Sequence, residues 1–244
     1  RLIRHVSSAF SEDPLRIYRV ARFYATLSEY NFKIHQSTYE LMKDIVRSDE
    51  IDDLSKERLW MELSKAFNTK NPWMFFDVLI KTNAAEKYYP EIINDDLIER
   101  KIKYFSESDI EKDIFLSIVG FSINFIELFG FPKKILDIYF IFNEFITKFV
   151  SIKLEEKDIL YFASSLDAFR RPIRLKIFLK QAQYFFDFHK MQDDKKFSIF
   201  LSLIDIIENK IDYGDMSNKN VQDIKKHIEN INLRVIKLAL SKNH

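Results

Sequence analysis

Apolar residues recur every three or four positions along most of the chain, which is the spacing of one face of an α-helix. Such a stripe near the N-terminus is formed by Leu15, Tyr18, Ala21 and Ala25. Asp13-Pro14 precedes it, and this pair suits a helix start because Asp caps exposed amides and proline fits the first helical position. The pattern predicts a helix from about Asp13 to Glu29.

The same signals, a capping residue and then apolar residues at helical spacing, predict the other helices. The expected ranges are 37–47, 55–67, 71–80, a helix ending at 105, 114–131, 135–149, 158–168, 172–190, 195–212 and 218–240. The two most apolar windows contain Ser, Asn, Asp and Glu residues that are costly in a bilayer, so buried helices and no membrane association are expected. Breaks in the pattern near 92 and 151–156 suggest domain boundaries.

The composition also favours helices. The 244 residues include 3 Gly and 5 Pro, too few for the tight turns of a many-stranded sandwich or barrel, so the predicted fold class is all-α. The lack of cysteine excludes disulfides, cysteine-ligated metals and thiol catalysis, and it fits a reducing compartment, so a cytoplasmic location is expected. With a net charge of +1, any nucleic-acid binding must depend on local basic patches.

Sequence motifs for catalysis are missing. The chain contains no Asp-x-Asp pair, no glycine-rich phosphate loop, no His-Asp pair and no HExxH. Metal-assisted phosphoryl transfer needs carboxylates that converge on the metal, so no such centre is expected here. The five histidines are scattered, and each is expected to be a surface or half-buried residue.

The most informative segment, 4–23, contains Glu12 and Asp13 followed by arginines at 16, 19 and 22. Steps of three residues rotate about 60° backwards round a helix, so Arg16 and Arg19 share a face and Arg22 lies further round. One interpretation is structural, with Asp13 as a cap, Glu12 at the positive helix end and the arginines paired with Glu57 or Glu62 of a neighbouring helix. The other is a basic ridge that acts with the carboxylate on a ligand.

The sequences RHVSSAF and EDPLRIYRVARF in this segment closely resemble the neck motif of bacterial class II tRNA nucleotidyltransferases, the CCA-adding enzymes. The resemblance continues through Leu54-Ser55-Lys56-Glu57-Arg58, Glu62-Leu63 and Tyr89-Pro90-Glu91-Ile92. Further along, the segment from Leu166 to Pro172, with Arg174, is similar to a tail motif of Escherichia-type members. The resemblance is dense over 1–92, thin over 93–150 and moderate to about 180. Bacterial poly(A) polymerases share the EDPLR and RxxRF elements.

This resemblance implies an elongated array of neck, body and tail helices. The neck would cover 1–92 and carry a helix that selects the nucleotide base, the body 93–150, and the tail for tRNA docking 151–244. In the family, the Glu-Asp-x-x-Arg helix is a protein template for the incoming base, and the matching residues here are Asp13 and Arg16. Arg19 and Arg22 match arginines that help to hold the nucleotide. Glu12, Arg58 and Glu62 are expected to support the template helix.

The template assignment is chemically reasonable. Arg16 can donate to cytosine or to N1 of adenine, while Asp13 can accept from the exocyclic amine of either base. Uracil and guanine would instead place a hydrogen-bond acceptor against the Asp13 carboxylate, which is itself an acceptor. The site would therefore reject these two bases. The resemblance therefore implies that CTP and ATP are the substrates.

The catalytic head of the family, with its metal-binding aspartates, has no counterpart in the sequence. The resemblance implies that Mg²⁺ is bound by a head domain or subunit outside this chain. Escherichia-type members also have a His-Asp hydrolase domain, but the corresponding region around 113–120 contains no histidine. No hydrolase activity is expected.

Basic residues in the tail are expected to contact tRNA phosphates. The first group comprises Arg170, Arg171, Arg174, Lys176 and Lys180, and the second comprises Lys219, Lys225, Lys226, Arg234 and Lys237. The alternative for both groups is a solvated helix face. The sequence thus predicts the base-selecting and tRNA-binding part of a CCA-adding enzyme, and the alternatives are a non-catalytic RNA-binding remnant and a poly(A) polymerase relative.

Overall fold

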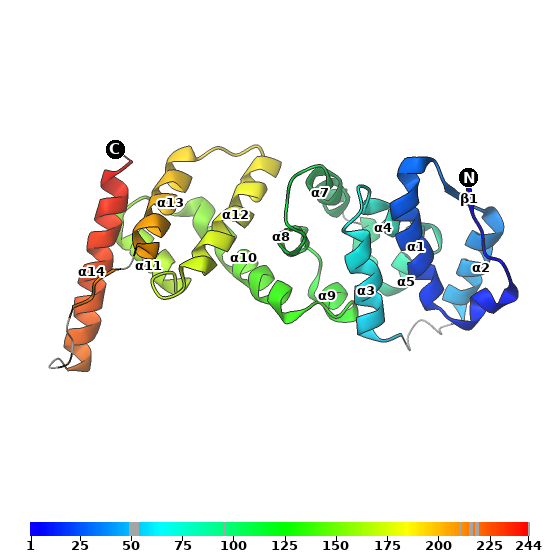
Figure 1. Ribbon diagram of the computed structural model, residues 1–244, viewed down its shortest axis with the longest axis horizontal. Helices are drawn as coiled ribbons and strands as arrows, with labels where there is room; N and C mark the ends of the chain where they lie inside the picture. Colours follow the sequence, from blue (N-terminus) through cyan, green and yellow to red (C-terminus); the bar gives the residue numbers. More distant parts are fainter. Residues whose placement is uncertain (49–53, 95, 210, 215–216, 218–219, 244) are drawn as a thin grey trace. The chain divides into compact units, whose positions relative to one another are not determined.

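The computed structural model of the chain (Figure 1) describes residues 1–48, 54–94, 96–209, 211–214, 217 and 220–243. These residues form α-helices joined by short turns, with one pair of two-residue strands, so the predicted all-α class is confirmed. The α-helices are α1 (Leu15–Leu27), α2 (Gln36–Arg47), α3 (Lys56–Ala66), α4 (Trp73–Lys81), α5 (Ala84–Tyr88), α6 (Glu91–Asn94), α7 (Asp96–Ser106), α8 (Lys112–Ile118), α9 (Ile123–Leu128), α10 (Lys133–Ser151), α11 (Glu156–Ser165), α12 (Pro172–Phe188), α13 (Asp194–Glu208) and α14 (Val221–Ser241). Two 3₁₀ segments, η1 (Ser8–Glu12) and η2 (Ser28–Tyr30), flank α1.

Contacts within the chain define two compact units, 1–136 and 137–244. The three segments expected from the sequence, 1–92, 93–150 and 151–244, are assigned by role, and they stay a prediction.

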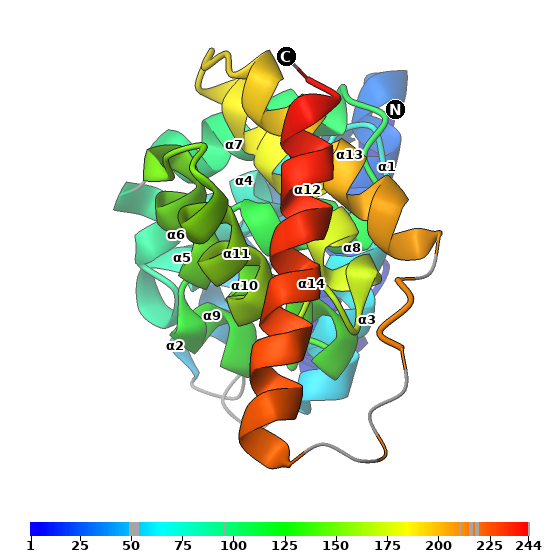
Figure 2. The same cartoon turned by 90° about the vertical axis from the view of Figure 1, so that its left-hand side faces the viewer.

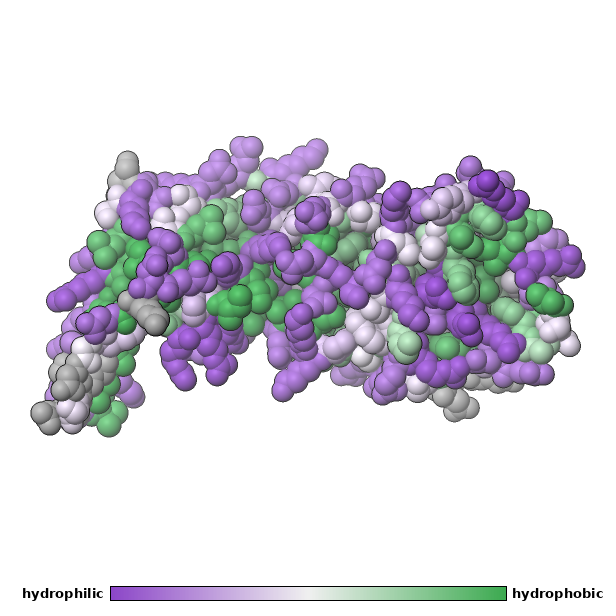
Figure 3. Space-filling view, viewed as in Figure 1, coloured by the Kyte–Doolittle hydropathy of each residue, from purple (hydrophilic) through white to green (hydrophobic). Residues whose placement is uncertain are grey.

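None of the described helices is both long and apolar enough to cross a bilayer. Hydrophilic side chains predominate on the face drawn in Figure 3, as is usual for amphipathic helices.

The first unit is built around α1, which packs against α3 and α4. The buried face of α1 includes Ile17, Tyr18, Ala21 and Ala25, so the apolar stripe in the sequence is the face that enters the core. Ahead of α1, strand β1 (Leu2–Ile3) pairs in parallel with β2 (Lys33–Ile34), which follows it. This pairing holds the N-terminal segment beside the chain that leaves α1.

One predicted helix is wrong. The window 114–131 contains two short helices, α8 and α9, rather than one. Gly120 between them has φ +96°, a conformation that interrupts a right-handed helix. The Ser122 hydroxyl then accepts a hydrogen bond from the Phe125 amide at 3.1 Å and caps α9.

The second unit comprises α10 from residue 137 onward and α11 to α14, and its core contains a cluster of phenylalanines. Phe149 lies at the centre, with ring centroids 5.3 Å from those of both Phe178 and Phe200 and 5.6 Å from that of Phe162. Helix α14 packs against α11 and α13, and Figure 2 shows it lying along the front of the view. The phenylalanine-rich windows therefore form core, as periodicity predicts.

Gly130 joins α9 to α10 with φ +57°, and a Cβ atom there would lie 2.7 Å from the Cβ of Lys56. We expect Gly130→Ala to lower the free energy of unfolding by about 1–3 kcal/mol, because it adds a close contact to backbone strain. Urea denaturation measures this loss. Gly214→Ala is the control, since Gly214 has φ +67° but nothing within 4 Å of the added atom. Equal losses in the two variants would contradict a role for the contact with Lys56.

Candidate functional site

Asp13 is held in place from two sides at the start of α1. Its Oδ1 accepts a hydrogen bond from the amide of Leu15 at 3.2 Å, so the carboxylate caps the helix as predicted. Its Oδ2 accepts from Nη2 of Arg58, on α3, at 2.8 Å. The Asp13 side chain is 28% exposed, which leaves part of the carboxylate open to a ligand.

Arg16 lies one turn further along α1 and is half-buried. Its Nη1 donates to the carbonyl oxygen of Ala9, in η1. A guanidinium carries several donors in one plane, so this bond sets the direction of the side chain while other donors stay available. The structure thus places Asp13 and Arg16 together at the N-terminal end of α1, each fixed by a contact outside the helix.

The two remaining arginines of α1 differ in their surroundings. Nε of Arg22 donates to Oε2 of Glu62, on α3, at 2.5 Å, and both side chains are largely buried, with exposed fractions of 17% and 9%. The same guanidinium lies 4.0 Å from the centre of the Phe23 ring. Arg19, in contrast, is exposed and has no partner among the described residues. The structural interpretation therefore holds for Arg22 and Glu62, and Arg19 is open to solvent.

The supporting residues expected from the sequence also differ from one another, since only some of them contact α1. Arg58 and Glu62 both contact α1, so the structure brings them to the site. Glu12 is exposed and has no partner among the residues that the structure describes, and the same is true of Glu57. Arg58 and Glu62 are one helical turn apart and face α1 from the same side of α3.

A buried contact that the sequence did not reveal connects α1 to a distant segment. The hydroxyls of Tyr18 and Tyr89 are 2.7 Å apart, and both residues are fully buried. Burial raises the pKa of Tyr89 well above its ordinary value, so its hydroxyl stays protonated and can donate. In the sequence Tyr89 stands out only as part of a family motif, because apolar periodicity alone cannot indicate a pair 71 residues apart.

The tail arginines lie at the start of α12. Arg170 is exposed without a partner in the described part of the chain, and Arg171 is exposed with its Nε 3.6 Å from Oδ2 of Asp167. Arg174 is half-buried in the first turn. Of the additional basic residues, Lys176 faces Glu208 at 3.4 Å, and Lys219 lies outside the described residues. The three arginines therefore share one region, in which Arg170 is exposed and has no ion-pair partner among the described residues.

The described residues do not fit a magnesium ion. No three His, Asp or Glu side chains among them converge on a position that a metal could occupy. At the start of α1, the Asp13 carboxylate is already paired with Arg58.

Sequence comparison identifies relatives of this site. A CCA-adding enzyme of Buchnera aphidicola is 47% identical over 92 residues, and a multifunctional CCA protein of Haemophilus influenzae is 43% identical over 109 residues. The N-terminal part of the chain is homologous to the CCA-adding enzymes. These matches cover 38% and 45% of this chain but only 22% and 26% of the relatives, so the chain matches about a quarter of their length. Residues 31–95 also match the family described as "Probable RNA and SrmB- binding site of polymerase A".

Comparison of folds extends over nearly the whole chain. A structure of a CCA-adding enzyme in its apo form has a TM-score of 0.59 at 15% identity, covering 97% of this chain and 58% of the other. The Thermotoga maritima CCA-adding enzyme in complex with tRNA has a TM-score of 0.53, also at 15% identity, covering 100% and 64%. At this identity the likeness concerns the fold alone. The likeness in fold therefore extends beyond the part of the chain that is similar to these relatives in sequence.

The Arg22–Glu62 ion pair predicts a loss of stability in Glu62→Gln. The variant leaves a largely buried guanidinium without its charged partner, which we expect to lower the free energy of unfolding by about 1–3 kcal/mol. Asp44→Asn is the matched control, because Arg47 and Asp44 form a pair whose side chains are 73% and 67% exposed and such pairs contribute less than about 1 kcal/mol. Chemical denaturation compares the two, and similar losses would contradict a special role for Glu62.

Proposed function

We propose that this chain provides the nucleotide selection and tRNA binding of a CCA-adding tRNA nucleotidyltransferase. The observation that carries the proposal is the pair of Asp13 and Arg16 at the start of α1, in the part of the chain that is homologous to CCA-adding enzymes. Solved structures with similar folds include CCA-adding enzymes in complex with CTP, with ATP and with tRNA. CTP and ATP are accordingly the proposed substrates and tRNA the proposed partner.

Base selection follows from the donors and acceptors that Asp13 and Arg16 present. Cytosine and adenine each offer an exocyclic amine to the carboxylate and a ring acceptor to the guanidinium. Uracil and guanine instead offer a carbonyl to the carboxylate, and two acceptors left facing each other are costly in a site sheltered from water. Because Arg58 already pairs with Asp13, the carboxylate is held in one orientation before the nucleotide arrives.

The other arginines take different roles in this proposal. Arg19 is exposed and unpaired among the described residues, which suits contact with the nucleotide phosphates. Arg22 is committed to Glu62, so its role in holding the nucleotide is indirect, through the position of α1. Arg58 acts on the base through Asp13. Glu12 has no hydrogen bond or ion pair with the described residues that would support a role in fixing α1.

The proposal also assigns a place to the catalytic step. We place the metal-dependent transfer, and the Mg²⁺ that it uses, in a catalytic head domain or subunit. Two observations support this division: the sequence has no Asp-x-Asp pair, and no metal-binding cluster occurs among the described residues. The chain then contributes specificity, and the head contributes the chemistry.

The proposal is tested by incorporation of CTP and ATP into tRNA that lacks its 3′ end. The chain is assayed alone and mixed with a separately produced head domain of a CCA-adding enzyme. We expect no incorporation by the chain alone and selective addition of C and A by the mixture. Incorporation by the chain alone would contradict the division of labour.

Two variants test the template in the same mixture. We expect Asp13→Ala and Arg16→Ala to reduce the preference for CTP and ATP over UTP by about 10- to 100-fold, since each removes one hydrogen bond that distinguishes the bases. Binding of tRNA should stay within twofold. Asp44→Ala is the control, because Asp44 is an exposed residue of α2. Unchanged selectivity in both variants would refute the template assignment.

The arginines at the start of α12 lead us to expect that binding of tRNA depends on the salt concentration. Replacing Arg170, Arg171 and Arg174 with Ala should weaken tRNA binding and reduce the slope of log affinity against log salt by about 1–3, depending on how many of them contact phosphates. The control removes the same charge from three exposed residues of the first unit, Arg47, Lys65 and Arg100. Equal effects of the two triple variants would show that only net charge matters, against a docking role for α12.

The match of residues 31–95 to a polymerase A family favours a second candidate, a poly(A) polymerase relative. Such a protein would add adenine repeatedly and would depend little on the shape of tRNA. A non-catalytic remnant would bind tRNA and add nothing even when the head domain is present. The incorporation assay distinguishes all three by the number and identity of the added nucleotides.

A further inference from the structure

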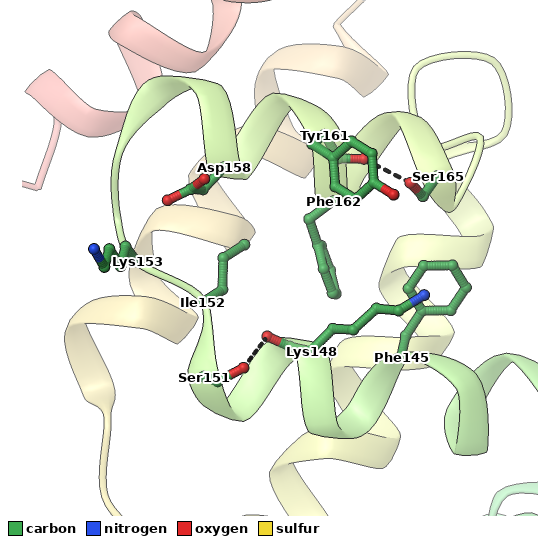
Figure 4. Close-up of a pocket in the computed structure, with 9 residues that line it drawn as sticks. All are labelled: Phe145, Lys148, Ser151, Ile152, Lys153, Asp158, Tyr161, Phe162 and Ser165. Carbon is green, nitrogen blue, oxygen red and sulfur yellow. Dashed lines mark hydrogen bonds between the residues drawn. The ribbon is translucent and has the colours of Figure 1, made fainter.

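The second unit contains a groove across α11 that is formed by three adjoining cavities. The first, of about 390 Å³, lies between the end of α10 and α11 (Figure 4). The second, of about 550 Å³, lies between α11 and α14, and the third, of about 310 Å³, follows at the turn between α11 and α12. Tyr161 lines the first and second cavities, and Ser164 lines the second and third. We refer to these three cavities together as the α11 groove.

Tyr161 stands at the junction of the first two cavities with 72% of its surface exposed. Its neighbour Phe162 points from α11 into the space between the helices in Figure 4, where it belongs to the core. Tyr161, in contrast, lies largely outside the core. An exposed aromatic ring with open space on two sides presents its face to another planar ring.

The α11 groove carries more positive than negative side chains. Lys153, Lys157, Lys225 and Arg170 line it, and none of the four has a partner among the described residues. Lys148 also lines it, but it is 3.5 Å from Glu144 and lies over the Phe145 ring.

The acidic residues of the groove are Asp158, Glu229 and Asp167. Asp167 is paired with Arg171, and Asp158 sits in the first turn of α11, where the helix dipole favours a carboxylate. The unpaired charge is therefore mainly positive, which favours an anionic ligand.

We propose that the α11 groove binds an unpaired segment of RNA. One base stacks on Tyr161, and the phosphates on either side are contacted by Lys153, Lys157 and Lys225. A paired helix keeps its bases stacked on one another, so it cannot use the Tyr161 face, whereas an unpaired nucleotide can. The site is distinct from base selection at α1, and it adjoins the arginines at the start of α12, with which it shares Arg170. Its test does not depend on nucleotide selection.

Fluorescence anisotropy with the full chain tests this proposal. The probes are a labelled single-stranded RNA of eight nucleotides and an RNA hairpin whose stem contains the same sequence. We expect Tyr161→Ala to weaken binding of the single strand by about 5- to 100-fold and Tyr161→Phe to stay within twofold, since phenylalanine keeps the aromatic face. Binding of the hairpin should be nearly unchanged in both variants. Tyr30→Ala is the control, because Tyr30 is 52% exposed and lies in the other unit.

A second variant tests the phosphate contacts. Replacing Lys153, Lys157 and Lys225 with Gln should reduce the slope of log affinity against log salt for the single strand by about 2, as three contacts to a single strand imply. Far-ultraviolet circular dichroism confirms that each variant is folded.

Three results would overturn the proposal. In the first, Tyr161→Ala binds the single strand as the wild type does, or Tyr161→Phe loses as much affinity as Tyr161→Ala. In the second, the hairpin is weakened as strongly as the single strand. In the third, sedimentation shows that Tyr161→Ala dissociates a dimer, which would assign the groove to a second copy of the chain. No nucleotide addition is measured, so these results are independent of the test of the template.

Discussion

The burial of one face of α1 is the constraint on which the candidate site depends. Ile17, Tyr18 and Ala21 are fully buried, and the Tyr18 hydroxyl meets that of Tyr89 inside the core. A buried hydroxyl needs a partner, because an unpaired one costs about 1–3 kcal/mol. The pair therefore fixes the rotation of α1 about its own axis, and this rotation decides which side chains at its start face outwards.

Two ion pairs then hold α1 against α3. In one pair the acid lies at the start of α1, and in the other the acid lies on α3. Near the start of α1 the acid is Asp13 and the base is Arg58, whereas further along the base is Arg22 and the acid is Glu62. If α1 slid by a turn, like charges would approach each other, which disfavours that register. The arrangement explains how a surface carboxylate such as Asp13 can keep one orientation without being buried.

The two units use positive charge in different ways. In the first unit Arg22 and Arg58 are paired, so their guanidinium groups are held in fixed positions at the candidate site. The cations of the α11 groove, such as Lys153 and Lys157, have no partners in the described part of the chain. Fixed donors suit discrimination between bases, and free lysines suit contact with a phosphate backbone whose position varies. A chain with a net charge of only +1 can therefore hold both kinds of surface.

Local signals in the sequence were enough to predict most helices and the beginning of the site. Asp13 caps α1 and the apolar stripe of α1 is buried because capping and periodicity act within a few residues. The sequence left Glu57 and Glu62 as equal partners for the arginines, and only the packing of α3 on α1 selected Glu62 for Arg22. The break at Gly120, the Tyr18–Tyr89 contact and the exposure of Tyr161 were likewise decided by the tertiary structure. The physical reason is that a periodic pattern marks which face of a helix is apolar, whereas neighbouring helices determine what covers each side chain and what stays open.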